Sequence, residues 1–109
     1  MVDDAILVLC TAPNEEVGAT LARGLVDAKL AACVNLVPGL RSFYSWEGEV
    51  NDDAEVQLLI KSRRRRFDAL EAWLSAQHPY DVPEIVALPI TAGSAPYLAW
   101  LAAQTEEGA

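Results

Sequence analysis

Residues 32–61 read ACVNLVPGLRSFYSWEGEVNDDAEVQLLIK, and this stretch decides the fold. It contains two extended runs, residues 32–46 and a second run best marked over residues 54–61, on either side of the turn signal Glu47-Gly48. Pro38-Gly39 interrupts the first run at a point where a central strand has to bulge or bend. The pattern therefore predicts a long β-hairpin with an irregularity in its first strand.

The segment before the hairpin predicts a buried strand followed by a helix. Residues 5–10 are continuously apolar, as in a central strand that is covered on at least one face. The helix is indicated by apolar side chains at helical spacing, and Pro13 is tolerated in its first turn. These apolar side chains are Val17, Leu21, Leu25 and Ala28.

The segment after the hairpin predicts a helix, a strand and a last helix. Ser62 can cap the first of these helices, which ends near Gln77 because the residue before Pro79 is pushed out of helical geometry. Residues 84–90 form a short strand bracketed by Pro83 and Pro89, which favours an edge strand or one with restricted pairing. The expected buried stripes are Phe67, Leu70, Trp73 and Leu74 in the first helix, and Tyr97, Trp100 and Leu101 in the second, which begins near Ser94 and Pro96.

The resulting order of elements is β-α-β-β-α-β-α. This order points to an α+β, ferredoxin-like β-α-β-β-α-β sandwich with an antiparallel sheet, an extended hairpin and an extra C-terminal helix. A chain of 109 residues fits one domain, residues 1–109. Both crossover helices are expected to cover the same face of the sheet. Val56 or its neighbours on the other face would then be exposed to water in a lone monomer.

The predicted hairpin is too long for the domain that carries it. Residues 32–46 in extended form span roughly 50 Å at about 3.3 Å per residue, whereas a compact chain of this length has a radius of gyration near ~13 Å. The outer half carries Phe43, Tyr44 and Trp46, and exposed aromatic patches usually mark interfaces. We therefore expect an obligate homo-oligomer. The alternative is a hairpin that curls back over its own sheet.

The charge balance argues against two classes of partner. Sixteen acidic residues against eight basic ones give a net charge of −8, so the average field repels nucleic acid and anionic membranes and tolerates cations. The run RRRR at residues 63–66 is interpreted as a solvated face or an ion-pair network between subunits, because Asp68 and Glu71 lie near it. Neither nucleic acid nor a membrane is expected as a partner.

The start of the chain and its cysteines predict a cytoplasmic protein. The first residues, MVDD, are acidic where a signal peptide is basic, and the apolar run that follows is short. Cys10 and Cys33 lie in apolar stretches and form no disulfide-like framework. We expect both thiols to be reduced, with Cys33 structural and Cys10 either a small buried hydrophobe or a metal-binding thiolate.

The one histidine of the chain lies in QHPYDVPE, residues 77–84. A helix stop and a strand entry account for this stretch without any chemistry, with a charged imidazole interacting with the last carbonyls of the helix. The alternative is a polar pocket between subunits. That pocket is expected to gather Tyr80, Asp81, Glu84, Glu55 and Lys61. No nucleophile, base and orienting group can be assembled from these residues, so no catalytic or cofactor-binding residue is assigned and no enzyme is expected.

Six stretches, in order, resemble the CutA divalent-cation tolerance proteins. They are LCTAP at 9–13, KLAACVNLVPG at 29–39, FYSWEG at 43–48, LLIKS at 58–62, HPYDVPEI at 78–85 and YLAWL at 97–101. The resemblance implies a ferredoxin-like subunit, a tight homotrimer formed through the long hairpin, a cytoplasmic location, and a role in tolerance of copper and other divalent cations without catalysis.

The resemblance also implies a metal site. The cysteine of LCTAP, here Cys10, and a histidine before the PY dipeptide, here His78, are the expected ligands for copper or another divalent cation. The resemblance places a second histidine at position 77, where this chain has Gln77, a poorer ligand. The alternative function is that of a signalling or interaction trimer built like the PII proteins, which binds a small molecule or a protein in clefts between subunits.

Overall fold

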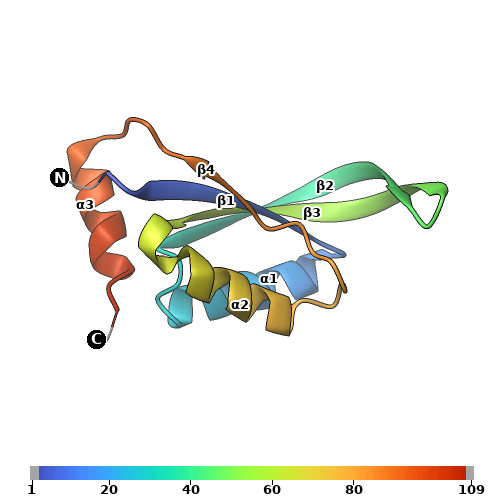
Figure 1. Ribbon diagram of the computed structural model, residues 1–109, viewed down its shortest axis with the longest axis horizontal. Coiled ribbons are helices and arrows are strands. Elements are labelled where there is room, and N and C mark those ends of the chain that lie inside the picture. Colours follow the sequence, from blue (N-terminus) through green and yellow to red (C-terminus); the bar gives the residue numbers. More distant parts are fainter. Residues whose placement is uncertain (1–2, 108–109) are drawn as a thin grey trace.

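The computed structural model describes residues 3–107, whose four strands form one antiparallel sheet in the order β2-β3-β1-β4 (Figure 1). This arrangement of strands and helices is the ferredoxin-like α+β fold that the sequence predicts. The elements are β1 (Ala5–Ala12), α1 (Glu15–Asp27), β2 (Cys33–Trp46), β3 (Glu49–Arg63), the 3-10 turn η1 (Arg64–Arg66), α2 (Phe67–Gln77), β4 (Val86–Pro89) and α3 (Ala95–Gln104). No helix within the described residues is long and apolar enough to cross a bilayer.

The main core lies between one face of the sheet and the two helices α1 and α2, which run side by side beneath it (Figure 1). Every second residue of β1 and of the inner part of β3 enters this core, as the two-residue period of a strand requires. Val56 is one of these buried residues, so it lies on the helix-covered face, and the expectation that it needs another cover was wrong. The helices contribute mainly Leu21, Leu25, Leu70 and Leu74.

Helix α3 closes one end of the molecule, on the side of the hairpin opposite its tip (Figure 1). Its Leu101 is fully buried in a second, smaller core with Ala5 and Ala32. The predicted stripe was wrong for Tyr97 and Trp100, which are 41% and 43% exposed. The short, apolar α3 therefore uses one buried leucine as its anchor and leaves its two aromatic rings, which pack on each other, at the surface.

The hairpin extends well beyond the helices, as the sequence predicts (Figure 1). The register of β2 against β3 shifts between Val37 and Leu40, which places the irregularity at Pro38-Gly39. Glu47 and Gly48 both adopt positive φ, as a tight hairpin turn of this kind requires. The molecule measures 46 × 26 × 22 Å, so the hairpin does not curl back, and the rings of Phe43 and Trp46 are at least half exposed.

Two predicted helix starts differ from the structure. Ser62 does not cap a helix, because β3 continues through it and its buried hydroxyl donates to the carbonyl of Leu30 at 2.6 Å. Pro13 precedes α1, and the cap is Asn14, whose side chain accepts a hydrogen bond from the amide of Val17. The Asn14 cap is a local contact three residues along the chain, whereas Ser62 found a distant partner that the local pattern does not specify.

The run of four arginines is an ion-pair network within the chain. Arg63 and Arg65 both donate to Asp4, at 2.8 and 2.9 Å, while Arg64 pairs with Asp68 and Arg66 with Glu107. Burial acts to raise the pKa of Asp4, but the hydrogen bonds and positive charges of Arg65 and Arg63 outweigh it. The pKa of this carboxyl therefore lies below its ordinary value of 3.8. Asp4 thus ties the first strand to the end of the hairpin.

Replacement of Asp4 by Asn tests this tie and its dependence on pH. Because the pKa of Asp4 is lower in the folded state, its contribution is fully present above the ordinary value and is lost as pH falls through the lowered one. We expect Asp4→Asn to lower the free energy of unfolding by about 1–3 kcal/mol near pH 7 and to have a smaller effect near pH 3. Urea unfolding at both pH values measures the difference.

The matched control is Asp68→Asn, which removes the exposed pair with Arg64 and is expected to cost no more than about 0.5 kcal/mol. An equal loss for both variants near pH 7, or a loss for Asp4→Asn that persists in acid, contradicts the assignment.

Candidate functional site

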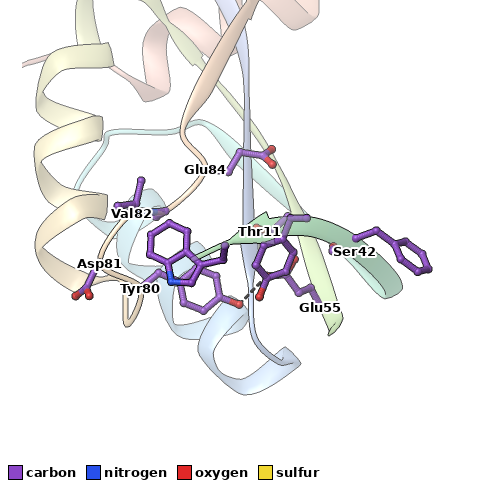
Figure 2. A pocket seen from close by; sticks show the side chains of 11 residues that line it. Thr11, Ser42, Glu55, Tyr80, Asp81, Val82 and Glu84 are labelled. Carbon is purple, nitrogen blue, oxygen red and sulfur yellow. Dashed lines mark hydrogen bonds between the residues drawn. The ribbon is translucent and has the colours of Figure 1, made fainter. Parts of the chain in front are cut away.

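A cleft of about 680 Å³ lies where the outer part of the hairpin meets the loop between α2 and β4 (Figure 2). Its volume falls within the size range of small-molecule sites. The loop and the outer hairpin supply most of its walls. Its lining consists of Thr11, Ser42, Phe43, Tyr44, Trp46, Glu55 and residues 80–84.

Two phenols in this cleft are bonded to carboxylates. The hydroxyl of Tyr80 donates to Oε2 of Glu55 at 2.6 Å, which joins the loop to β3 (Figure 2). Within the hairpin, the hydroxyl of Tyr44 donates to Asp53. Burial and the bond to the Glu55 carboxylate raise the pKa of Tyr80 well above its usual range, so this phenol stays protonated and acts as a fixed donor.

His78 is buried behind the cleft and holds the loop in place. Its Nδ1 accepts a hydrogen bond from the amide of Tyr80 at 3.1 Å, and its Nε2 lies 2.8 Å from the carbonyl oxygen of Thr11. This geometry assigns the proton to Nε2, because a carbonyl oxygen only accepts. The imidazole therefore bonds across to the end of β1, and the predicted contact of a charged ring with the last carbonyls of α2 was wrong.

Cys10 is fully buried in the main core, one residue before Thr11. Its thiol makes a weak contact with the carbonyl oxygen of Thr11 at 3.6 Å. Burial, followed by the negative charges of Glu84 and Glu55, raises the pKa of the Cys10 thiol to about 12. At neutral pH the sulfur is therefore a protonated, poorly nucleophilic group, and metal binding by it requires loss of that proton.

The other residues of the predicted pocket divide between two places. Tyr80, Glu84 and Glu55 line the cleft together, and Asp81 belongs to its lining but points away from Tyr80 and Glu55 (Figure 2). Lys61 was expected there and lies elsewhere, because its ammonium group bonds Asn35 and lies 4.0 Å from the sulfur of Cys33. Cys33 on β2 and Lys61 on β3 lie directly opposite each other in the sheet, which accounts for that contact.

The number and state of the ligand atoms decide whether these residues fit a metal ion. Within residues 3–107 no three His, Cys, Asp or Glu side chains are close enough together to hold one ion. Both ring nitrogens of His78 are engaged, and Cys10 is protonated. Gln77 is exposed and lines a separate shallow groove with Glu16 and Thr20. A single chain therefore presents no ready-made metal centre.

The sequence alone did not indicate two members of this site. Thr11 offers its carbonyl oxygen to both His78 and Cys10, and a backbone acceptor carries no signal in the residue type. Tyr44 bonds Asp53, which lies two positions beyond Asn51, the residue directly opposite Tyr44 on β3, so this pair depends on the strand register after the bulge. The alternation of side chains along the hairpin, counted with the bulge included, is the sequence signal that identifies Asp53.

A ferredoxin-like sheet with an overhanging aromatic hairpin places this chain in a class of small α+β proteins. The family described as CutA1 divalent ion tolerance protein matches residues 6–104. The divalent-cation tolerance protein CutA of Thermus thermophilus is 54% identical over 99 residues, which cover 91% of this chain and 96% of that one. The chain belongs to the CutA family.

Solved structures agree with this assignment. The divalent cation tolerance protein of Thermus thermophilus superposes with a TM-score of 0.91 at 52% identity, covering 94% of this chain and 99% of the other. CutA1 of Oryza sativa gives a TM-score of 0.94 at 50% identity over 98% of both chains. Some relatives are longer: the chain spans 58% of the chloroplastic CutA 1 protein of Oryza sativa and 53% of that of Arabidopsis thaliana.

The state of Cys10 is open to a direct test by thiol labelling. In a Cys33→Ser variant, Cys10 is the one remaining thiol. Near pH 8 we expect the folded variant to react with an aromatic disulfide reagent at least about 100-fold more slowly than the same chain unfolded in urea. The reason is that the thiolate is the reacting species and the folded state keeps Cys10 protonated. Absorbance of the released thiol gives both rates. Equal rates in the folded and unfolded chain contradict a buried, protonated thiol.

Proposed function

We propose that this protein acts in the tolerance of divalent cations, copper among them, as a cytoplasmic homotrimer that binds metal weakly and carries out no catalysis. Family membership supports the role in tolerance. The observation that carries the oligomer is the exposed aromatic hairpin, whose Phe43, Tyr44 and Trp46 are 62%, 43% and 50% exposed. In the proposed trimer, this aromatic surface of the hairpin becomes part of the interface between subunits.

Both edges of the sheet favour the same conclusion. β2 and β4 are the edge strands, and all four residues of β4 are exposed, including Val86 and Leu88. An exposed apolar edge invites pairing with another strand, and natural proteins cover or blunt such edges. β4 carries no charged residue that performs this task. Contact between edge strands of neighbouring copies covers both the exposed residues of β4 and the aromatic side chains of the hairpin.

Light scattering tests the assembly. We expect a mass of about three times 11.8 kDa at micromolar concentration, and a lower mass for the double variant Phe43→Ser, Trp46→Ser, because apolar area buried between copies drives association. The control Val26→Ser changes a residue of similar exposure on α1 and is expected to keep the full mass. A monomer mass for the unchanged protein contradicts the proposal.

For the metal we propose Cys10 and His78 as ligands, supplied by each chain of the trimer. A thiolate and an imidazole are donors that suit copper and zinc. Their present bonds explain why binding is weak: a cation has to displace the proton of Cys10 and one of the two hydrogen bonds of His78. Affinity is therefore expected to rise with pH, since protons compete for both donors.

Isothermal titration with copper and with zinc tests these ligands. Cys10→Ser and His78→Ala are each expected to weaken binding by at least about tenfold, while the control Cys33→Ser leaves it unchanged, because Cys33 lies on the opposite face of the sheet. Circular dichroism confirms that each variant is folded. Equal affinities for the unchanged protein, Cys10→Ser and His78→Ala remove both residues from the proposal.

A second candidate function is the binding of a small molecule, as in signalling trimers built like the PII proteins. The cleft between the outer hairpin and the loop that follows α2 favours it, because the hollow has the size and the mixed polar and apolar lining of a ligand site. In this second case the effect on metal tolerance is indirect. Failure of purified protein to take up copper or zinc, with a ligand bound in the cleft, distinguishes the two functions.

A further inference from the structure

The segment that forms β4 and α3 differs from the rest of the surface. Every Asp, Glu, Lys and Arg of the chain lies outside residues 85–105, yet most side chains of this segment are exposed. Among residues 3–107, four of the six large apolar side chains that are exposed outside the hairpin lie here: Val86, Leu88, Tyr97 and Trp100. An exposed surface that lacks charge and carries aromatic groups has the composition of the centre of a protein interface.

These side chains lie on one face of the sheet. Ala5 packs with Leu101 of α3 in the second core, so α3 lies on the face that α1 and α2 leave open. Residues directly opposite one another share a face, and one such row crosses all four strands: Cys33, Lys61, Leu7 and Leu88. Tyr97 lies beside Cys33 at one end of this row, and Leu88 ends it on β4. We call Val86, Leu88, Tyr97 and Trp100 the β4–α3 surface.

A closed ring of three copies needs two different surfaces on each copy. A surface that pairs with its own equivalent does so around a twofold axis and gives a dimer, whereas a ring of three is built from head-to-tail contacts. The aromatic hairpin is one of the two surfaces. The hairpin tip and α3 lie at opposite ends of the molecule, so a chain cannot cover its own α3 with its own hairpin (Figure 1). The hairpin of one copy therefore has to meet another part of the next copy.

Charge selects the β4–α3 surface as that part. Residues 41–55 of the hairpin contain five acidic residues against one basic one. A second hairpin has the same charge, and the exposed faces of α1 and α2 carry Glu15, Glu16, Asp27, Asp68 and Glu71. Placing like charges opposite each other in an interface is unfavourable. The uncharged β4–α3 surface accepts an acidic hairpin without this repulsion, and it offers aromatic rings to aromatic rings.

We propose that the β4–α3 surface of one copy receives the hairpin of the next, with the rings of Tyr44 and Trp46 packed on Tyr97 and Trp100. Tyr44 and Trp46 are two positions apart on β2 and so share one face of the hairpin. Three such contacts run head to tail and close the ring. The inference rests on the proposed trimer, since it names the surface that each hairpin occupies.

Removal of the two rings of α3 tests the receiving surface. Light scattering of Tyr97→Ser, Trp100→Ser is expected to give about 11.8 kDa at a concentration where the unchanged protein has three times that mass. The control Val26→Ser, at a position as exposed as Trp100, is expected to keep the full mass. A monomer mass for the unchanged protein refutes the trimer itself. A full trimer mass for the α3 variant leaves the trimer standing and overturns only this inference.

Cross-linking tests the direction of the contact with every aromatic ring in place. Ser42→Cys lies on the face of Tyr44 and Trp46, and Gln104→Cys lies one turn beyond Trp100 on α3. In a Cys33→Ser background, the chain with both cysteines is expected to give covalent trimers with a flexible bis-maleimide on a denaturing gel, because the protonated thiol of Cys10 is poorly reactive.

Chains that carry Ser42→Cys or Gln104→Cys alone are the matched controls, and each is expected to stay a single chain on the gel. Covalent dimers from Ser42→Cys alone mean that hairpins meet hairpins, and they overturn the inference. Absence of cross-linking in the chain with both cysteines, when light scattering shows the trimer, overturns it as well.

Discussion

The antiparallel pairing of β2 with β3 is the interaction on which the rest of the structure depends. It runs from Cys33 opposite Lys61 to Trp46 opposite Glu49, with one shift of register at Pro38-Gly39. Its inner part contributes to the core between the sheet and helices α1 and α2, and its outer part has no helix to cover it. Because backbone hydrogen bonds hold the outer part straight, its aromatic side chains stay out of reach of their own core. The cleft and the exposed surface both follow from that overhang.

A set of polar contacts then fixes the loop that forms the second wall of the cleft. The buried imidazole of His78 joins the end of β1 to the backbone of Tyr80, and the phenol of Tyr80 joins the loop to Glu55 on β3. Each bond satisfies a polar group that is otherwise removed from water, so the loop has one favoured position. Within a single chain, His78 therefore has a structural role.

The metal role of the family and the chemistry of the cleft use different parts of the molecule. Cys10 lies in the core, where burial and two carboxylates keep its proton in place, whereas Glu55 and Glu84 themselves face the cleft. The same two negative charges therefore help to keep the thiol protonated.

The sequence by itself determined the order of the elements, the turn at Glu47-Gly48, the bulge at Pro38-Gly39 and the exposure of Phe43, Tyr44 and Trp46, because periodicity and turn residues act over a few positions. Only the tertiary structure decided that Ser62 bonds Leu30, that Lys61 turns away from the cleft and that His78 bonds Thr11. Those contacts join residues from 26 to 67 positions apart. A side chain's partner at such separations is set by how the elements pack, and no local pattern records it.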